Sequence, residues 1–134
     1  MFAVMNENKT HYIDAEKASL PNDIDDGDEV FNESNLMHSI NGYVFGNGPV
    51  PSTRMNAKTR WYTLDVGTEV DLHTPHWHGN TVLAGGMRTD MQSLLPGMMM
   101  IADMVPDNAG TWLFHCHVND HIAAGMQMRY RVTA

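Results

Sequence analysis

Histidine is concentrated at two places in this chain. Six of the eight histidines lie in two short segments, His73 to His78 and His115 to His121. Side chains of an extended strand alternate between its two faces. The first segment therefore places His76 and His78 on one face, while His73, an odd number of residues earlier, tends to the other. Each segment is expected to serve two separate sites.

The second segment repeats this arrangement around the only cysteine of the chain. His115 and His117 share one strand face, and Cys116 points to the opposite one. A single cysteine excludes an intrachain disulfide, so the thiol needs another explanation.

One face thus offers two imidazoles, a thiolate and, a few residues beyond the last histidine, a thioether. These donors are His73, Cys116, His121 and Met126. Two imidazoles and a thiolate with a weak, distant methionine form the ligand field of a blue-copper electron-transfer site. Zinc would bind the same donors but could not use them for redox, and a structural zinc site is expected to lack the methionine. Simple packing is the remaining alternative.

The opposite face offers four imidazoles and no sulfur. They belong to His76, His78, His115 and His117. This set suits a harder copper cluster that handles oxygen, which would be a second, separate metal site.

The pattern of the chain from Leu36 onward is one of short strands separated by turns. Asn41-Gly42 is one such turn. The expected strands are Trp61 to Val66, Glu69 to Leu72, Thr81 to Leu83, Met98 to Val105, Thr111 to Cys116 and Met126 to Thr133. No long helical pattern competes with them. In 134 residues this favours one all-β domain, residues 1–134, built as a Greek-key sandwich or barrel.

The segment from about residue 14 to 35 is different, because it holds half of the acidic residues. Asp14 to Glu33 contains 8 of the 16 acids. Pro21 and Gly27 interrupt any long periodicity, so we expect an exposed acidic loop. A calcium loop over Asn22 to Glu29 is the weaker alternative, since Ile24 would stand at a ligand position.

Charge and hydropathy exclude several classes of partner. The net charge of −8 argues against nucleic acid and anionic membranes. No stretch approaches the roughly 20 apolar residues of a membrane span. Met1 to Met5 do not form a secretory signal, so a signal for export would lie outside this chain or have been removed or replaced.

The two histidine segments resemble those of the multicopper oxidases, and more closely the C-terminal cupredoxin domain of laccases, two-domain laccases and ceruloplasmin-like ferroxidases, which bears type 1 copper. The matching motifs are His73-Thr74-Pro75-His76-Trp77-His78-Gly79, His115-Cys116-His117, and then His121, Gly125 and Met126. Weaker likeness runs through Met37 to Gly42, Pro96-Gly97 and Gly110 to Phe114. The likeness covers most of the chain and implies a cupredoxin-like fold.

The resemblance also implies a role for each donor. His73, Cys116, His121 and Met126 would be type 1 copper ligands. His76 would be a type 2 ligand, and His78, His115 and His117 would be type 3 ligands. The family's trinuclear cluster takes eight histidines, so the other four would come from a second cupredoxin domain of a parent protein or from another copy of the chain. Similarity to two-domain members implies a homotrimer. Its interface would be the face that carries the four imidazoles of the second set.

We therefore expect an electron-transfer domain that accepts an electron from a small reducing substrate or metal ion. A laccase-like or metal-oxidising oxidase, active only when a partner completes the cluster, is the alternative. A copper-storage module is a third class, and a copper nitrite reductase is a more distant relative. The resemblance places the parent protein in the periplasm or outside the cell.

Several other residues need an interpretation. Asp120 precedes His121 and is a candidate contact for a cationic substrate, although a loop residue that caps a backbone amide is the simpler interpretation. His38 is expected to be hydrogen-bonded and structural, and His11 exposed. Trp77 and Trp112 are expected to pack around the sites. The methionines near residue 100, which are Met91, Met98, Met99, Met100 and Met104, are expected to fill the core in preference to binding Cu(I).

Overall fold

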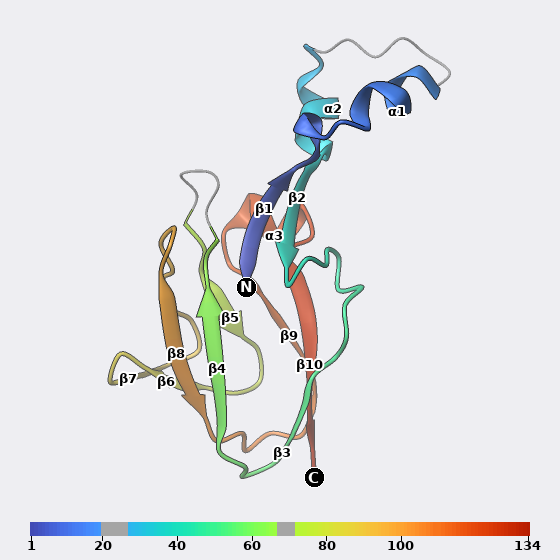
Figure 1. Cartoon of the computed structure of the whole chain (residues 1–134). Helices are drawn as coiled ribbons and strands as arrows, with labels where there is room; N and C mark the ends of the chain where they lie inside the picture. Colours follow the sequence, from blue (N-terminus) through green and yellow to red (C-terminus); the bar gives the residue numbers. More distant parts are fainter. Residues whose placement is uncertain (20–26, 67–71) are drawn as a thin grey trace.

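A computed structural model describes residues 1–19, 27–66 and 72–134 of the chain. Strands dominate it, and its helices are short (Figure 1). The elements are β1 (Phe2–Asn6), a 3-10 turn η1 (Glu7–Lys9), α1 (Ile13–Ser19), α2 (Glu29–Ser34), β2 (Leu36–Ile40), β3 (Ser52–Arg54), β4 (Thr59–Leu64), β5 (Pro75–Trp77), β6 (Val82–Ala84), β7 (Met87–Thr89), β8 (Met99–Met104), β9 (Gly110–Cys116), α3 (Asn119–Ala123) and β10 (Gln127–Thr133). The predicted all-β class is confirmed.

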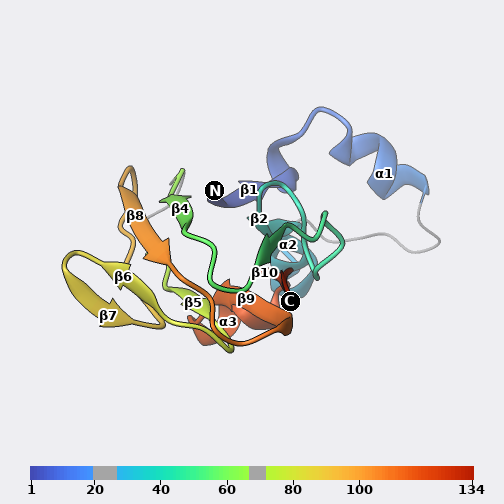
Figure 2. The same cartoon turned by 90° about the horizontal axis from the view of Figure 1, so that it is seen from below.

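The strands form two larger sheets and one small one. Sheet I has the order β3-β10-β9-β5, and sheet II has the order β4-β8-β6-β7. In the view from below, the two larger sheets lie beside each other (Figure 2). β1 and β2 form a separate antiparallel pair that extends away from them toward α1 and α2 (Figure 1).

The core joins sheets I and II and also takes in Phe2 and Val4 of β1 and Ile40 of β2. Alternation along β10 buries Met128, Tyr130 and Val132 and leaves the residues between them facing outward. Trp61 on sheet II joins the two layers, because its ring packs against Phe114 and Tyr130 of sheet I at centroid distances of 5.1 and 5.4 Å. Aromatic contacts of this kind contribute more to stability than their buried area alone would give.

The later strands were predicted well. β8, β9 and β10 agree with the expected ranges to within one residue at each end. β4 and β6 lie close to their expected ranges, displaced toward the N-terminus and C-terminus respectively. The Asn41-Gly42 turn is present, with both residues at positive φ and paired hydrogen bonds between Ile40 and Tyr43. Most of the expected strand Glu69 to Leu72 lies outside the described residues.

The expectation of an acidic loop from about residue 14 to 35 is wrong at both ends, where the structure has helices. Helices α1 and α2 occupy residues 13–19 and 29–34. The Asp28 side chain accepts hydrogen bonds from the Val30 and Phe31 amides, which is the usual way to start a helix. Neither helix buries a residue, so the acidic side chains there are solvated. The calcium-loop alternative falls mostly on residues outside the described part.

Candidate metal centres

Three of the four expected soft donors meet in the interior. The Nδ1 atoms of His73 and His121 are 3.1 Å apart, and the Cys116 Sγ lies 3.7 and 3.6 Å from them. All three side chains are buried. His73 lies 43 positions from Cys116 and 48 from His121 in the chain, so the fold itself builds this cluster.

The three donor atoms have the spacing of a metal site. An ion about 2.0 to 2.3 Å from two nitrogens and one sulfur keeps its ligand atoms roughly 3 to 4 Å apart. The observed separations of 3.1 to 3.7 Å fall in that range. The residues could therefore hold a metal ion without a large rearrangement, and the thiolate with two imidazoles suits copper.

Met126 closes the same region of the fold. Its side chain is fully buried. Its amide donates to the His121 carbonyl oxygen at 2.9 Å, and its own carbonyl oxygen accepts from the Cys116 amide at 3.1 Å. The backbone of Met126 is thus fixed to both residues, beside the donor cluster.

Sheet I places the donors through the pairing of β5 with β9. Pro75 lies opposite Cys116, and His76 lies opposite His115. The short helix α3 then returns His121 to the interior, where it is buried. Thr74 ties the two segments together, because its Oγ1 accepts from the His117 amide at 3.0 Å and its amide donates to the Cys116 Sγ at 3.4 Å.

Burial controls the protonation of the thiol. Desolvation raises the pKa of Cys116, and the hydrogen bond from the Thr74 amide opposes this only in part. The nearby Asp120 carboxylate raises the pKa further. The metal-free protein therefore holds the thiol proton at neutral pH, and metal binding has to displace it.

The four imidazoles of the second set gather on the other side of β9. The His115 Nε2 lies 3.1 Å from His76 Nδ1 and 3.0 Å from His78 Nε2. These three could hold a metal ion. The His117 ring lies 5.0 Å from the His76 ring and 5.5 Å from the His115 ring, so it belongs to the same group.

The backbone fixes the orientation of the His115 ring. Its Nδ1 lies 2.7 Å from the Cys116 carbonyl oxygen, which can only accept, so Nδ1 carries the proton and donates. The Nε2 lone pair then faces His76 and His78. Desolvation, followed in His76 by the charge of His78, lowers the pKa of His76 and His115. Both rings therefore favour the neutral form that a metal requires.

The remaining sequence predictions have mixed outcomes. Asp120 is exposed on α3, and no side-chain cap is formed at the start of that helix. His38 donates from Nδ1 to the Leu36 carbonyl oxygen, as expected for a structural histidine, and its ring also lies 4.9 Å from His121. His11 is exposed, as predicted. Trp77 is buried and packs against Phe114.

The expectation for the methionines is only partly right. Met104 is buried and Met100 packs against the core. Met91, Met98 and Met99 are exposed, so they do not fill the core. Alternation along β8 separates Met99 from Met100, because neighbours on a strand face opposite sides.

Two carboxylates beside the histidines were not predicted. Asp65 Oδ1 lies 3.7 Å from His73 Nε2, and Asp90 Oδ2 lies 3.6 Å from His76 Nε2. The first could have been recognised, because Trp61, Thr63 and Asp65 share the inward face of an alternating run. An acid on the buried face of a strand needs a partner. Nothing local in the sequence marks Asp90.

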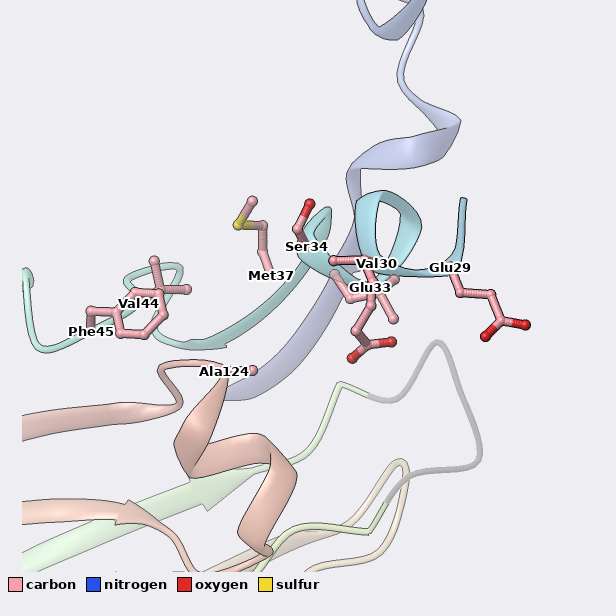
Figure 3. A pocket seen from close by; sticks show the side chains of 9 residues that line it. Glu29, Val30, Glu33, Ser34, Met37, Val44, Phe45 and Ala124 are labelled. Atoms are coloured by element: carbon pink, nitrogen blue, oxygen red, sulfur yellow. The ribbon is translucent and has the colours of Figure 1, made fainter. Parts of the chain in front are cut away.

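A surface pocket opens beside the end of α3 (Figure 3). Its volume is about 850 Å³. It is lined by Glu29, Val30, Glu33, Ser34, Leu36, Met37, Val44, Phe45 and Ala124. Two of these residues, Glu29 and Glu33, place carboxylates on α2, and Ala124 ends the helix that contains His121. The pocket is therefore apolar with an acidic side.

Comparison with known proteins gives a consistent result. The profile of the multicopper oxidase family matches residues 15–134. The chain is 41% identical to hephaestin from Rattus norvegicus and 36% identical to ferroxidase HEPHL1 from Mus musculus, in each case over 98% of the chain and 12% of the relative. It is 38% identical to human ceruloplasmin over 98% of the chain and 13% of that protein. The chain thus spans about an eighth of these curated relatives.

Solved structures agree on the fold. A multicopper oxidase from Campylobacter jejuni, described as a metallo-oxidase, superposes with a TM-score of 0.67 at 16% identity, over 99% of this chain and 29% of that one. Another multicopper oxidase gives a TM-score of 0.66 at 25% identity, over 84% and 40% of the two chains. These neighbours establish the cupredoxin-like fold. In the described residues, no helix is long and apolar enough to cross a membrane.

Proposed function

Because the chain belongs to the multicopper oxidase family, whose metal is copper, we propose that it is a type 1 blue-copper electron-transfer domain. The proposed ligands are His73, Cys116, His121 and Met126. The observation that supports this most directly is the convergence of two Nδ1 atoms and one Sγ within 3.7 Å in a buried site. Residues 1–134 then act as a single domain, a view supported by one continuous cluster of buried residues.

Copper bound there would accept one electron at a time from a reducing substrate. The chain's own residues shield the donors and hold them in place. Burial of His73, Cys116 and His121 excludes water from the donors. The Thr74 amide holds the sulfur, and the pairing of β5 with β9 limits movement of the ligands between oxidation states. A protein-held geometry of this kind keeps the reorganisation on electron transfer small.

The second histidine set supplies half of an oxygen-reducing copper cluster in this proposal. His76, His78, His115 and His117 would contribute four ligands, and four more would come from another cupredoxin domain or another copy of the chain. The exposure of His78 and His117 leaves room for such a partner. We propose a homotrimer as the assembly in which this face is covered.

The proximity of the two sets supports transfer between them. Cys116 is bonded in sequence to both His115 and His117, so a short covalent path joins the thiol to the second set. A storage module would not require such a path. The isolated chain lacks half of the cluster and is therefore expected to transfer electrons without reducing oxygen.

Oxidation of a metal ion is the alternative activity of the completed oxidase. Two curated relatives are named ferroxidases. Asp120 is exposed next to His121, and Glu29 and Glu33 line the pocket at the end of the same helix. These carboxylates would attract a cationic substrate and repel an anionic one. A laccase-like substrate would instead use the apolar side of that pocket. The parent protein is proposed to work in the periplasm or outside the cell.

A copper titration of the metal-free chain tests the proposal. The intense visible absorption and the copper bound per chain are measured together. The expected result is that the band saturates with the first ion bound per chain. A chain that binds copper without the band would contradict the type 1 assignment.

A double variant tests the second set. His78→Gln with His117→Gln removes two exposed imidazoles and is expected to keep the band while it abolishes any additional copper bound by the wild type. Sedimentation of both proteins, with and without copper, measures the assembly. A wild type that remains monomeric at saturating copper would contradict the homotrimer.

A further inference from the structure

A buried carboxylate lies behind one of the proposed copper ligands. Asp65 is fully buried, and its Oδ1 lies 3.7 Å from the Nε2 of His73, which is also buried. The opposite ring nitrogen of His73, Nδ1, faces Cys116 and His121. The imidazole therefore lies between the donor cluster and an acid.

The fold holds Asp65 at this place through its backbone. Its amide donates to the Met98 carbonyl oxygen at 3.0 Å, and its carbonyl oxygen accepts from the Gly97 amide at 3.1 Å. The amide of the next residue, Val66, donates to the Phe2 carbonyl oxygen. The Phe2 ring in turn stacks on His73 at a centroid distance of 5.6 Å. Phe2 thus contacts both the segment that carries the acid and the imidazole.

We propose that Asp65 is a positioning residue that orients His73 for copper and stabilises the oxidised over the reduced ion. This inference rests on the proposed type 1 site. A carboxylate on the Nε2 side favours the tautomer with its proton on Nε2, which leaves the Nδ1 lone pair for the metal. Carboxylates in this relation to ligating histidines fix the ring and raise its basicity.

The charges determine the direction of the effect. The charges of Cu(II), one thiolate and one carboxylate sum to zero. With Cu(I) in place of Cu(II), the same two groups leave one net negative charge in a buried region. A net charge without a partner is costly where water is excluded. Asp65 therefore lowers the reduction potential of the site.

The test compares Asp65→Asn with the wild type by their affinities for Cu(II) and Cu(I), measured by competition with chelators. Loss of the charge is expected to reduce the ratio of Cu(II) to Cu(I) affinity by about tenfold or more, because a unit charge acts strongly at low effective dielectric. Tenfold corresponds to about 59 mV for one electron, so a redox titration of the blue band should show the same rise.

Asp103→Asn is the matched control. It removes the same charge from the neighbouring strand β8, where Asp103 is exposed and paired with Arg60. Solvent screens the charge of Asp103, so the ratio of Cu(II) to Cu(I) affinity in this variant should equal that of the wild type. Should the Asn variant fail to fold, Asp65→Ser, which is neutral and smaller than Asp, provides the same comparison.

The possible outcomes separate the two proposals. A wild type without a blue band would reject the type 1 site itself. A blue wild type whose Asp65 variants keep its affinity ratio would overturn the role of Asp65. Equal losses of affinity for both oxidation states would also overturn the charge effect, because they indicate a purely structural role.

Discussion

Cys116 and His115 are neighbours on β9, yet their side chains reach different groups. The thiol lies within 3.7 Å of His73 and His121, whereas the His115 imidazole lies within 3.1 Å of His76 and His78. Strand alternation alone produces this division. One peptide bond thus separates a sulfur-containing donor set from a set of imidazoles.

Removal of the thiol provides the first prediction. Cys116→Ser should abolish the intense visible band, because the hydroxyl is a poor substitute for a soft thiolate. The fold should persist, with the free energy of unfolding of the metal-free protein lowered by no more than about 2 kcal/mol. Absorption of the copper-loaded protein and chemical denaturation measure the two effects.

His78→Gln is the matched variant for this experiment. It removes an exposed imidazole from the other face of the sheet and should retain the band. A band that survives in Cys116→Ser, or one lost in His78→Gln, would contradict the division into two donor sets.

The second prediction concerns the axial thioether. Met126→Leu should raise the reduction potential and leave copper bound, since it deletes only a weak donor of the proposed set. A redox titration of the blue band measures the potential. Met128→Leu makes the same change at another buried methionine and should leave the potential where it was. Loss of copper from Met126→Leu would show that the thioether contributes more to copper binding than a weak donor should.

The third prediction is a pH dependence of stability in the metal-free protein. Burial lowers the pKa of His76 and His115 from the usual 6.5. The unfolded chain therefore binds more protons than the folded one just below that pH. Stability is fully present above about pH 6.5 and is lost as the pH falls toward the lowered values.

Replacement of one of these histidines should make that loss smaller. His115→Gln is expected to show a shallower fall in the free energy of unfolding between about pH 7 and pH 5. His11→Gln changes an exposed histidine and should keep the slope of the wild type. Equal slopes in all three proteins would mean that burial of His115 has no effect on its protonation.

The fourth prediction tests the packing next to the second histidine set. Gly79 follows His78 at a φ of +73°, and a Cβ there would clash with the Trp112 ring. Gly79→Ala should lower the free energy of unfolding by about 2 kcal/mol or more, measured by chemical denaturation.

Gly86→Ala is the control for this change. Gly86 also has a positive φ, of +81°, but no atom lies within 4 Å of the added Cβ. Its cost should be only the backbone term of about 1 kcal/mol. Similar losses in the two variants would mean that Trp112 moves aside freely.

The sequence predicts the later strands and the donor sets because both depend on local alternation. β9 is recognised by its run of aromatic and apolar residues, because Phe114, His115 and Cys116 at its end are all buried. β10 has one buried face, and its hydrophobic residues repeat with a period of two. The same rule separates Cys116 from its histidine neighbours. It predicts which residues share a face, and the fold then supplies the distances between the two segments.

Elements that depend on distant contacts were missed. β1 is a strand because it pairs with β2, far along the chain, which no local pattern shows. Helices α1 and α2 are short, polar and unburied, so no apolar period marks them. Alternation could have placed Asp65 on a buried face, but its contact with His73 comes only from the fold.

The pairing of β5 with β9 has a consequence for redesign of this chain. A one-residue slip between strands turns every side chain of the moving strand to its other face. Deletion of a single residue within β9 would carry the sulfur to the imidazole side and mix the two kinds of donor. A shift of two residues would preserve the faces and change only which residues meet. The side of the sheet that receives the sulfur therefore depends on the register of β9 against β5, and only an even shift keeps the sulfur apart from the imidazoles.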